Sequence, residues 1–462
     1  MFKSKKEGIS FMALCMGFFM IILDVTIVNV ALPVIASYFS TTLSKLQWVV
    51  DGYTIAFVGL LLVVGWLSDY FGAKKIFLLG LILFSITSLS CALASSIFLL
   101  IFFRFLQGAS AAFLLPSSLS LINNIYQDPK EKAQAIGIWA SLGGVACASG
   151  PFLGGVLTAV ISWRAIFLIN ILIGCTSYLV VSRTIVSAKL KCKAGKIDFL
   201  GQIVGFIALL FLVFALIEVC NYGLNGLIMT CLALSISMLL LFIFIEHKVK
   251  NPMIPLWIFR NKMTSMGLAV SAILNLCFYG ALFTMPFYFA NIRHYSTLRV
   301  GLALLPLPGL AVIGSYLGGK VISKWGAALV IFIGFFIAAC GFLALIELEQ
   351  NAPIYLWIML PFLAIGFGVS FATPAMTFAV LHSVQSEYEG ILSAVLNIFN
   401  QVGNLIGVAI FGSIVIAAHS FVSGMHIMFT IIGITFLITA FSSVMIMGKF
   451  KSSAVLNNLN LD

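Results

Sequence analysis

The sequence predicts an all-α membrane protein with 14 transmembrane helices and both termini in the cytoplasm. Of its 462 residues, 62% are hydrophobic and only 8% are charged, against about 25% charged in ordinary soluble domains. Its apolar segments are unbroken runs of about 20 residues, the length of a helix that crosses the hydrocarbon core. Only α-helices and closed β-barrels span a lipid bilayer. The segments lack the short alternating strands of a membrane β-barrel, so they are predicted to be helices.

The apolar windows follow one another along the whole chain. Because their number is even, both termini lie on the same side. The basic N-terminus precedes a long apolar run without a small-residue cleavage site, so we expect an uncleaved first span. The expected spans are 9–31, 46–67, 75–95, 97–122, 133–160, 163–183, 198–218, 224–245, 264–290, 300–322, 327–348, 353–380, 388–416 and 424–447.

The basic residues indicate which side is cytoplasmic. Of the 25 Lys and Arg residues, four fall in segments predicted to lie outside, Arg104 falls inside a span, and the other twenty fall in inside segments. This bias supports cytoplasmic termini. The net charge of +11 follows from the same bias and from contact with anionic lipid, so it gives no reason to expect nucleic acid as a partner.

The first span contains a carboxylate in the stretch LDVTIVNVALP. A charge at the depth of Asp24 costs at least about 2.5–3.5 kcal/mol, and such a residue usually faces a wet cavity or a partner charge. Arg104 interrupts span 97–122 in the same way. Each residue is about 7 positions from the outer end of its span, so both lie roughly 10 Å below the outer face.

Further acids occur nearer to the outer boundary. Asp51 lies on span 46–67, with Gln47 and Thr54 about one turn away on either side. It is either a second protonatable or cation-attracting group, or a hydrated interfacial aspartate. We expect Glu218, near the outer end of span 198–218, to be interfacial.

Two spans have an unusual composition. Span 133–160 is crowded with Gly and Ala, which let helices approach closely, and its Pro151 favours a kink. These features suit a helix that bends and slides, although ordinary close packing is part of the explanation. Span 388–416 carries a row of amides on one helix face, which suits a cavity wall; the alternative is interhelical hydrogen bonding. The amides are Asn397, Asn400, Gln401 and Asn404.

The two ends of the chain resemble each other. GWLSDYFGA (65–73) ends the second span and GKVISKWGA (319–327) ends the tenth, and glycines recur at offsets of 253–258 residues in two further pairs of spans. Internal repeats of this kind mark secondary transporters. We expect an N-terminal six-helix bundle at 1–185, a linker with two inserted helices at 186–250, a C-terminal six-helix bundle at 251–450 and a cytoplasmic tail at 451–462.

Five motifs follow one another in the first half: LDVTIVNVALP with Asp24, Thr26, Asn29, Ala31 and Pro33; GWLSDYFGAKK with Gly65, Leu67, Asp69, Gly72, Lys74 and Lys75; RFLQGASAA with Arg104, Gln107 and Gly108; GGVACASGPFLGG with Gly150, Pro151, Gly154 and Gly155; and WRAIFLINI at 163–171. With these motifs at family spacing, the whole chain resembles the major facilitator superfamily, in particular its fourteen-helix drug:proton antiporter branch. The resemblance implies the major facilitator fold and proton-coupled multidrug efflux by alternating access.

The resemblance also implies roles for these residues. We expect Asp24 to carry the exchanged proton and to attract cationic substrates, with Arg104 tuning its pKa; the alternative is a static ion pair that only fixes helix packing. The loop motif implies a cytoplasmic latch at Asp69, against a plain turn with topology-setting lysines. The antiporter motif implies a hinge. The expected cavity lining is Asn29, Gln107, Asn397, Asn400, Gln401 and Asn404.

The second half departs from the first. Ser323 stands where the loop motif has an aspartate, and Phe362 stands opposite Arg104, so ionic chemistry is expected in the first half. Nine scattered cysteines and five histidines at loops or helix ends indicate no metal site and no embedded enzyme. We expect no cofactor besides the proton.

The rival functions are less consistent with the sequence. A receptor does not need Asp24 and a hinge-like span, a channel needs a continuous polar pore, and GPFLGG disfavours a symporter. Export of one endogenous metabolite remains the alternative to multidrug efflux. The expected partners are small-molecule substrates and the lipid bilayer of the cell (inner) membrane. We expect a monomer, with a periplasmic adaptor where the host has an outer membrane.

Overall fold

The computed structural model describes residues 5–126, 128–185, 198–249, 252, 254–347, 355–383 and 388–459. It contains 14 helices that are long and apolar enough to cross a membrane, and the described residues form no β-strand. The predicted fold class is therefore confirmed. Which side of the membrane holds the termini stays a prediction.

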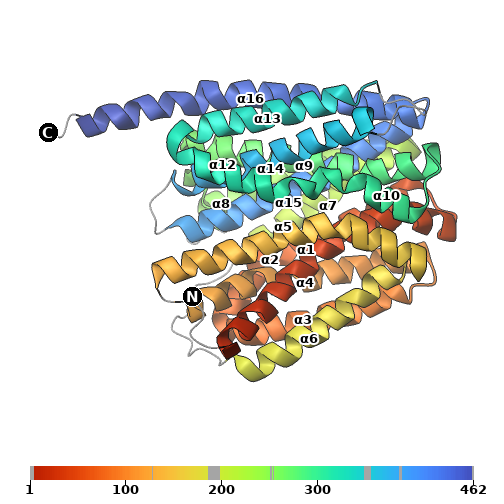
Figure 1. Cartoon of the computed structure of the whole chain (residues 1–462), viewed down its shortest axis with the longest axis horizontal. Coiled ribbons are helices and arrows are strands. Elements are labelled where there is room, and N and C mark those ends of the chain that lie inside the picture. The colour runs from red at the N-terminus through yellow and green to blue at the C-terminus, as the bar shows by residue number, and fades with distance from the viewer. Residues whose placement is uncertain are drawn as a thin grey trace. The chain divides into compact units, whose positions relative to one another are not determined.

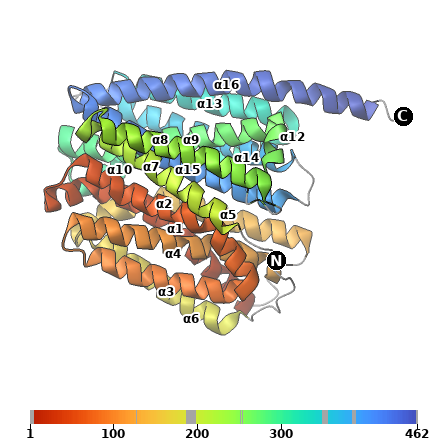
Figure 2. The same ribbon diagram turned by 180° about the vertical axis from the view of Figure 1, so that it is seen from behind.

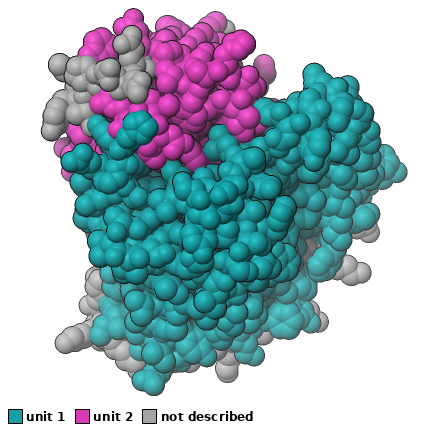
Figure 3. Space-filling view, turned by 90° about the vertical axis from the view of Figure 1, so that its right-hand side faces the viewer, with its two compact units in different colours: residues 1–253, 294–302 teal, residues 254–293, 303–462 magenta. Residues whose placement is uncertain are grey.

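The chain divides into two compact units (Figure 3). Unit 1 comprises residues 1–253 and 294–302, and unit 2 comprises residues 254–293 and 303–462. The predicted linker at 186–197 lies outside the described residues. The predicted domain limits stay predictions.

Unit 1 holds the first eight helices. Within it, α2 packs on α4, α1 packs on α5, and α3 packs on α4 and α6. The pair α3 and α6 lies side by side in both ribbon views (Figure 1, Figure 2). The helices are α1 (Lys5–Phe39), α2 (Leu43–Phe71), α3 (Ala73–Ala92), α4 (Ile97–Ile125), α5 (Pro129–Val160), α6 (Ala165–Thr184), α7 (Phe199–Tyr222) and α8 (Gly226–Lys248).

Unit 2 repeats this packing with its own helices. There α9 packs on α15, α12 packs on α14, and α13 packs on α14 and α16. The elements are η1 (Leu256–Arg260), α9 (Lys262–Phe287), η2 (Tyr288–Ile292), α11 (Pro306–Gly309), α12 (Ala311–Trp325), α13 (Ala327–Ala344), η3 (Tyr355–Met359), α14 (Leu360–Leu381), α15 (Glu389–Ala417) and α16 (Phe421–Leu459); α10 (Thr297–Leu304) crosses the unit boundary.

Matched glycines make the repeat visible in the backbone. Gly72 ends α2 with φ 96°, and Gly326 ends α12 with φ 79°, a conformation that side chains with a Cβ rarely adopt. A Cβ atom placed on Gly108 would lie 2.0 Å from the Tyr53 carbonyl oxygen, and one on Gly366 would lie 1.7 Å from the Leu307 carbonyl oxygen. The same close helix contact is therefore built once in each unit.

Three elements differ from their predicted form. The tenth span is one run in the sequence, but it forms α10, α11 and α12 because Pro306 and Pro308 lack the N–H that a continuous helix needs. Helix α2 continues to Phe71, so only Gly72 separates it from α3. Helix α16 continues to Leu459, into the segment expected to be a tail.

The two inserted helices pack together, and α7 also packs on α2 of unit 1. The Gln202 side-chain amide donates to the Gly59 carbonyl at 2.5 Å, and a Cβ on Gly59 would lie 2.3 Å from the Phe206 ring. At the other end of α7, the Trp48 indole donates to Glu218 at 3.0 Å. Glu218 is half-buried and hydrogen-bonded in this contact.

Candidate functional site

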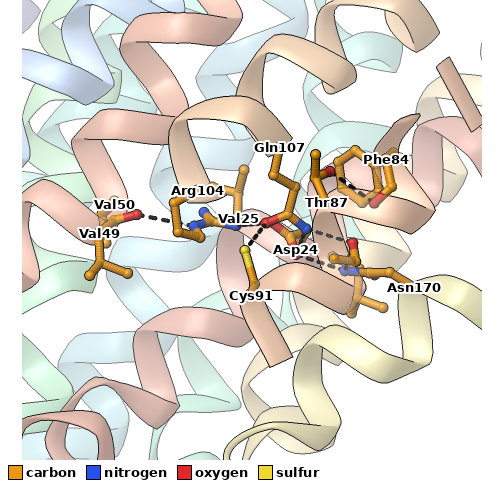
Figure 4. A network of polar contacts seen from close by, with 12 residues as sticks. Asp24, Val25, Val49, Val50, Phe84, Thr87, Cys91, Arg104, Gln107 and Asn170 are labelled. Carbon is orange, nitrogen blue, oxygen red and sulfur yellow. Dashed lines mark hydrogen bonds and ion pairs between the residues drawn. The ribbon is translucent and has the colours of Figure 1, made fainter. Parts of the chain in front are cut away.

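The candidate site in unit 1 is a buried ion pair. Asp24 on α1 is 0% exposed and Arg104 on α4 is 1% exposed. Arg104 Nη1 contacts Asp24 Oδ2, so the two charges predicted at equal depth meet (Figure 4). The other carboxylate oxygen, Oδ1, accepts from Gln107 Nε2 at 3.0 Å and from Asn170 Nδ2 at 2.8 Å. The pair thus joins α1, α4 and α6.

Gln107 organises the centre of this network. It is three residues after Arg104 and therefore lies on the same face of α4. Its carbonyl oxygen accepts from Arg104 Nη1 at 2.7 Å, while its amide donates to Ser88 Oγ of α3 at 2.8 Å. The Cys91 thiol also donates to this carbonyl at 3.5 Å. Gln107 is 0% exposed in this conformation and is bonded within the charge network, and its role in lining a cavity stays a prediction.

The other side of the guanidinium is held by α2. Arg104 Nε donates to the Val49 carbonyl at 3.0 Å, and the guanidinium carbon lies 4.3 Å from the centre of the Tyr53 ring. Cations are attracted to the faces of aromatic rings. Gly108 permits this approach, because any side chain there would meet the Tyr53 backbone. The RFLQG motif therefore combines a charge, its amide partner and the gap that admits α2.

Asp51 is not part of this network. It is 0% exposed, and neither carboxylate oxygen has a hydrogen-bond partner among the described residues. The Thr54 hydroxyl donates to the Val50 carbonyl at 3.3 Å, within its own helix. Asp51 is therefore a buried acid rather than a hydrated interfacial one in this conformation.

The residues of the loop motif have different environments. Asp69 is exposed in the last turn of α2, and Lys75 is exposed at the start of α3. Lys74 Nζ donates to the carbonyl oxygens of Ser182 at 2.9 Å and Ile185 at 2.5 Å, at the C-terminal end of α6. A cation is favourable at that end of a helix. Gly65 has open space around it.

The glycines of the predicted hinge motif make close helix contacts. A Cβ on Gly150 would lie 2.0 Å from Thr26 Oγ1, and one on Gly154 would lie 2.8 Å from the Ile27 carbonyl oxygen, so this face of α5 presses on α1. A Cβ on Gly155 would lie 3.0 Å from the Thr297 carbonyl oxygen. In the same contact between α5 and α10, a Cβ atom on Gly301 would lie 2.4 Å from the Pro151 carbonyl oxygen.

The amide row on α15 belongs to unit 2 and divides into separate contacts. The Asn400 side-chain oxygen accepts from Ser271 Oγ at 2.5 Å and from Asn275 Nδ2 at 3.1 Å, which links α15 to α9. The Asn397 amide donates to its own helix, at the Ser393 carbonyl. Asn404 is 2% exposed, and its side-chain oxygen has no partner among the described residues. Gln401 is half-buried.

Asn29, also expected to line a cavity, lies on α1. It is 3% exposed, and its amide donates to the Val25 carbonyl at 3.0 Å. Its side-chain oxygen has no partner among the described residues.

Sequence reasoning missed Cys91, which donates to Gln107, and three further members of the charge network. Asn170, Ser88 and Tyr53 hold Asp24, Gln107 and Arg104 respectively. Asn170 had a detectable signal, because an amide inside an apolar span usually bonds across helices. Ser88 had none, since a serine also satisfies itself on its own helix backbone.

Comparison with known proteins identifies the chain's relatives. A sequence model of the Major Facilitator Superfamily matches residues 14–408. The chain is 32% identical to a methylenomycin A resistance protein of Bacillus subtilis (strain 168), over 95% of this chain and 94% of that protein. It is 31% identical to the drug efflux pump JefA of Mycobacterium tuberculosis, over 89% of this chain and 81% of the pump.

Solved structures show the same fold. A bacterial homolog of the human lysosomal transporter Spinster, inward-facing and occupied, aligns with a TM-score of 0.68 at 16% identity and covers 96% of this chain and 98% of its own. The nucleoside transporter NupG aligns with a TM-score of 0.67 at 12% identity, covering 95% of this chain and 99% of its own.

Proposed function

Because the chain belongs to the Major Facilitator Superfamily, we propose that it exports small lipophilic, often cationic, compounds in exchange for protons. The observation that carries the proposal is the presence of two fully buried carboxyl groups, Asp24 and Asp51, inside apolar membrane spans. Ionisable groups at such depth are expensive, and they mark ion and proton pathways. The relatives named for drug efflux and antibiotic resistance support export of foreign compounds.

The proposed cycle is alternating access. A carboxyl group takes up a proton from outside and releases it into the cytoplasm, while the compound moves outward. Each elementary charge that crosses the membrane supplies about 2.3 kcal/mol per 100 mV, so one or two protons are enough to drive useful accumulation. We propose the cell membrane as the location, the proton as coupling ion without a further cofactor, and a monomer as the working unit. In a host with an outer membrane, a periplasmic adaptor would extend the route.

Transport by purified protein in lipid vesicles tests this function. With an acidic lumen, protons leaving the vesicle should drive tetraphenylphosphonium and other lipophilic compounds inward. A protonophore should abolish this accumulation, and protein-free vesicles should show none. Broad uptake would support multidrug export, whereas uptake of one metabolite alone would support the alternative substrate class. Accumulation that ignores the proton gradient for every compound would contradict the proposal.

A further inference from the structure

We propose that Asp51 is the carboxyl group whose proton is exchanged for a cationic substrate, and that Asp24 is a fixed anion that holds Arg104. The exchange rests on the proposed function, whereas the protonation of Asp51 in this conformation rests on the structure alone. The sequence favours Asp24 as the proton carrier, because its motif is the more distinctive. The geometry of the two sites points the other way.

The carboxylate of Asp24 is held in place from two helices. Both of its oxygens are occupied, Oδ2 by Arg104 and Oδ1 by the amides of Gln107 and Asn170. All three groups donate hydrogen bonds, so both oxygens are held by donors from α4 and α6. Arg104 cannot lose its own proton in a protein. A proton on Asp24 would therefore leave a buried guanidinium without its counter-charge, which is strongly unfavourable.

Asp51 has the opposite surroundings. It is 0% exposed, and no hydrogen bond among the described residues reaches either oxygen. An ionised carboxylate in such a place would be stabilised neither by water nor by a donor, and buried groups of this kind become neutral instead. Asp51 therefore holds a proton in this conformation.

The charged groups on α2 and on the helices packed against it do not change this conclusion. Arg104 is paired with Asp24, Glu218 accepts from Trp48 and from Asn221 at 2.7 Å, and Lys45 lies 4.9 Å from the centre of the Phe98 ring. Glu7, Asp69, Lys74 and Lys75 lie in the terminal turns of α1, α2 and α3, at the other end of these spans from Asp51. Besides Asp51, the charged groups in the spans of α2 and of the helices packed against it are Glu7 and Asp24 on α1, Lys45 and Asp69 on α2, Lys74 and Lys75 on α3, Arg104 on α4 and Glu218 on α7.

The position of Asp51 on its helix separates it from Arg104. The guanidinium stacks on Tyr53, and Asp51 is two residues away, about 200° around the helix. The Asp51 side chain therefore projects from the face of α2 opposite to Tyr53. When alternating access opens this face, the O–H bond of Asp51 breaks and the proton passes to water. The carboxylate left behind has no built-in counter-ion, so a cationic compound is the natural replacement.

Infrared difference spectroscopy tests the protonation without any substrate. Purified wild-type protein at neutral pH should show the carbonyl stretch of a protonated carboxylic acid, and the band should fall as pH rises. Asp51→Asn should remove this band. Glu218→Gln, which removes another acid of unit 1, should leave it unchanged, and so should the paired variant Asp24→Asn with Arg104→Gln. A band that survives in Asp51→Asn, or that disappears in the paired variant, would overturn the assignment.

Proton release on binding tests the exchange. Saturating tetraphenylphosphonium should release protons from wild-type protein and from Glu218→Gln in weakly buffered detergent, and Asp51→Asn should release none. Asp51→Glu keeps a titratable group and should restore release. Release from Asp51→Asn at the wild-type level would sink the proposal. If the infrared assignment holds but no vesicle accumulates compounds, the proposed function fails and the buried proton on Asp51 stands.

Discussion

At the scale of single residues, the chain buries two carboxyl groups inside apolar spans in different surroundings. Asp24 is buried with a full set of donors, and Asp51 is buried with none among the described residues. A buried ion pair is weak evidence of stability, because desolvation offsets the attraction between the charges. Breaking such a pair from one side is costly, because an uncompensated charge stays behind.

The Asp24–Arg104 pair therefore predicts a strong coupling in stability. Asp24→Asn and Arg104→Gln should each destabilise the protein by about 3–5 kcal/mol, since each leaves one charge buried alone. The double variant removes both charges and should lose clearly less than the sum of the two single losses. Melting temperatures in detergent measure the cycle. Additive losses would mean that the two side chains do not interact in the membrane.

At the scale of elements, glycines decide how closely helices meet. On α5, Gly150 faces the Thr26 side chain and Gly154 faces the Ile27 carbonyl of α1, two and three residues beyond Asp24, whereas Gly144 has open space around it. The position of α5 is thus coupled to the segment of α1 that carries the charge centre.

This contact predicts a contrast between two glycines of one helix. Gly150→Ala should reduce transport severely, because its Cβ would fall 2.0 Å from Thr26 Oγ1 and α1 or α5 has to shift. Gly144→Ala on the same helix should transport normally. Initial rates in vesicles, normalised to inserted protein, give the comparison. Equal rates for both variants would show that α5 is not restrained at this contact.

The amide row of α15 predicts a second contrast. Asn400 links α15 to α9, whereas the buried Asn404 oxygen has no partner among the described residues. Asn400→Ala should lower the melting temperature and reduce transport of every compound alike, since it removes an interhelical link. Asn404→Ala should change which compounds are exported and leave stability nearly unaltered. A panel of transport rates separates the two, and a compound-specific loss for Asn400→Ala would reverse the assignment.

At the scale of the whole molecule, one helical plan is used twice with different chemistry. The place of Arg104 in the repeat is taken by Phe362, which is 1% exposed and packs edge-on against Phe289 at 6.2 Å between ring centres. The paired glycines Gly108 and Gly366 nevertheless keep the same backbone approach. Packing was thus retained in both halves, while the described charges at depth belong to the first half.

The proposed latch acts on the cycle of the whole molecule. Asp69 is exposed in this conformation, so its proposed latch contact forms in another state of the cycle. A charge-assisted hydrogen bond of this kind contributes about 1.5–3 kcal/mol to that state. Asp69→Asn should keep insertion and tetraphenylphosphonium binding but slow turnover roughly 10-fold, the factor that corresponds to about 1.4 kcal/mol. Wild-type turnover in a well-inserted variant would contradict the latch and would mean that this motif forms only a turn in which Lys74 binds the end of α6.

The sequence alone is enough to predict the class, the number of spans, the repeat and the residues that carry charge into the membrane. These properties follow from local composition and spacing, because a span must be long and apolar and a buried charge is conspicuous within it. It did not determine which buried acid has donors. That depends on Asn170 and Ser88, which come from other helices, and on Tyr53, whose ring lies 4.3 Å from the Arg104 guanidinium carbon. The folded arrangement of the helices settles it, because the donors that hold Asp24 come from residues up to 146 positions away in the chain.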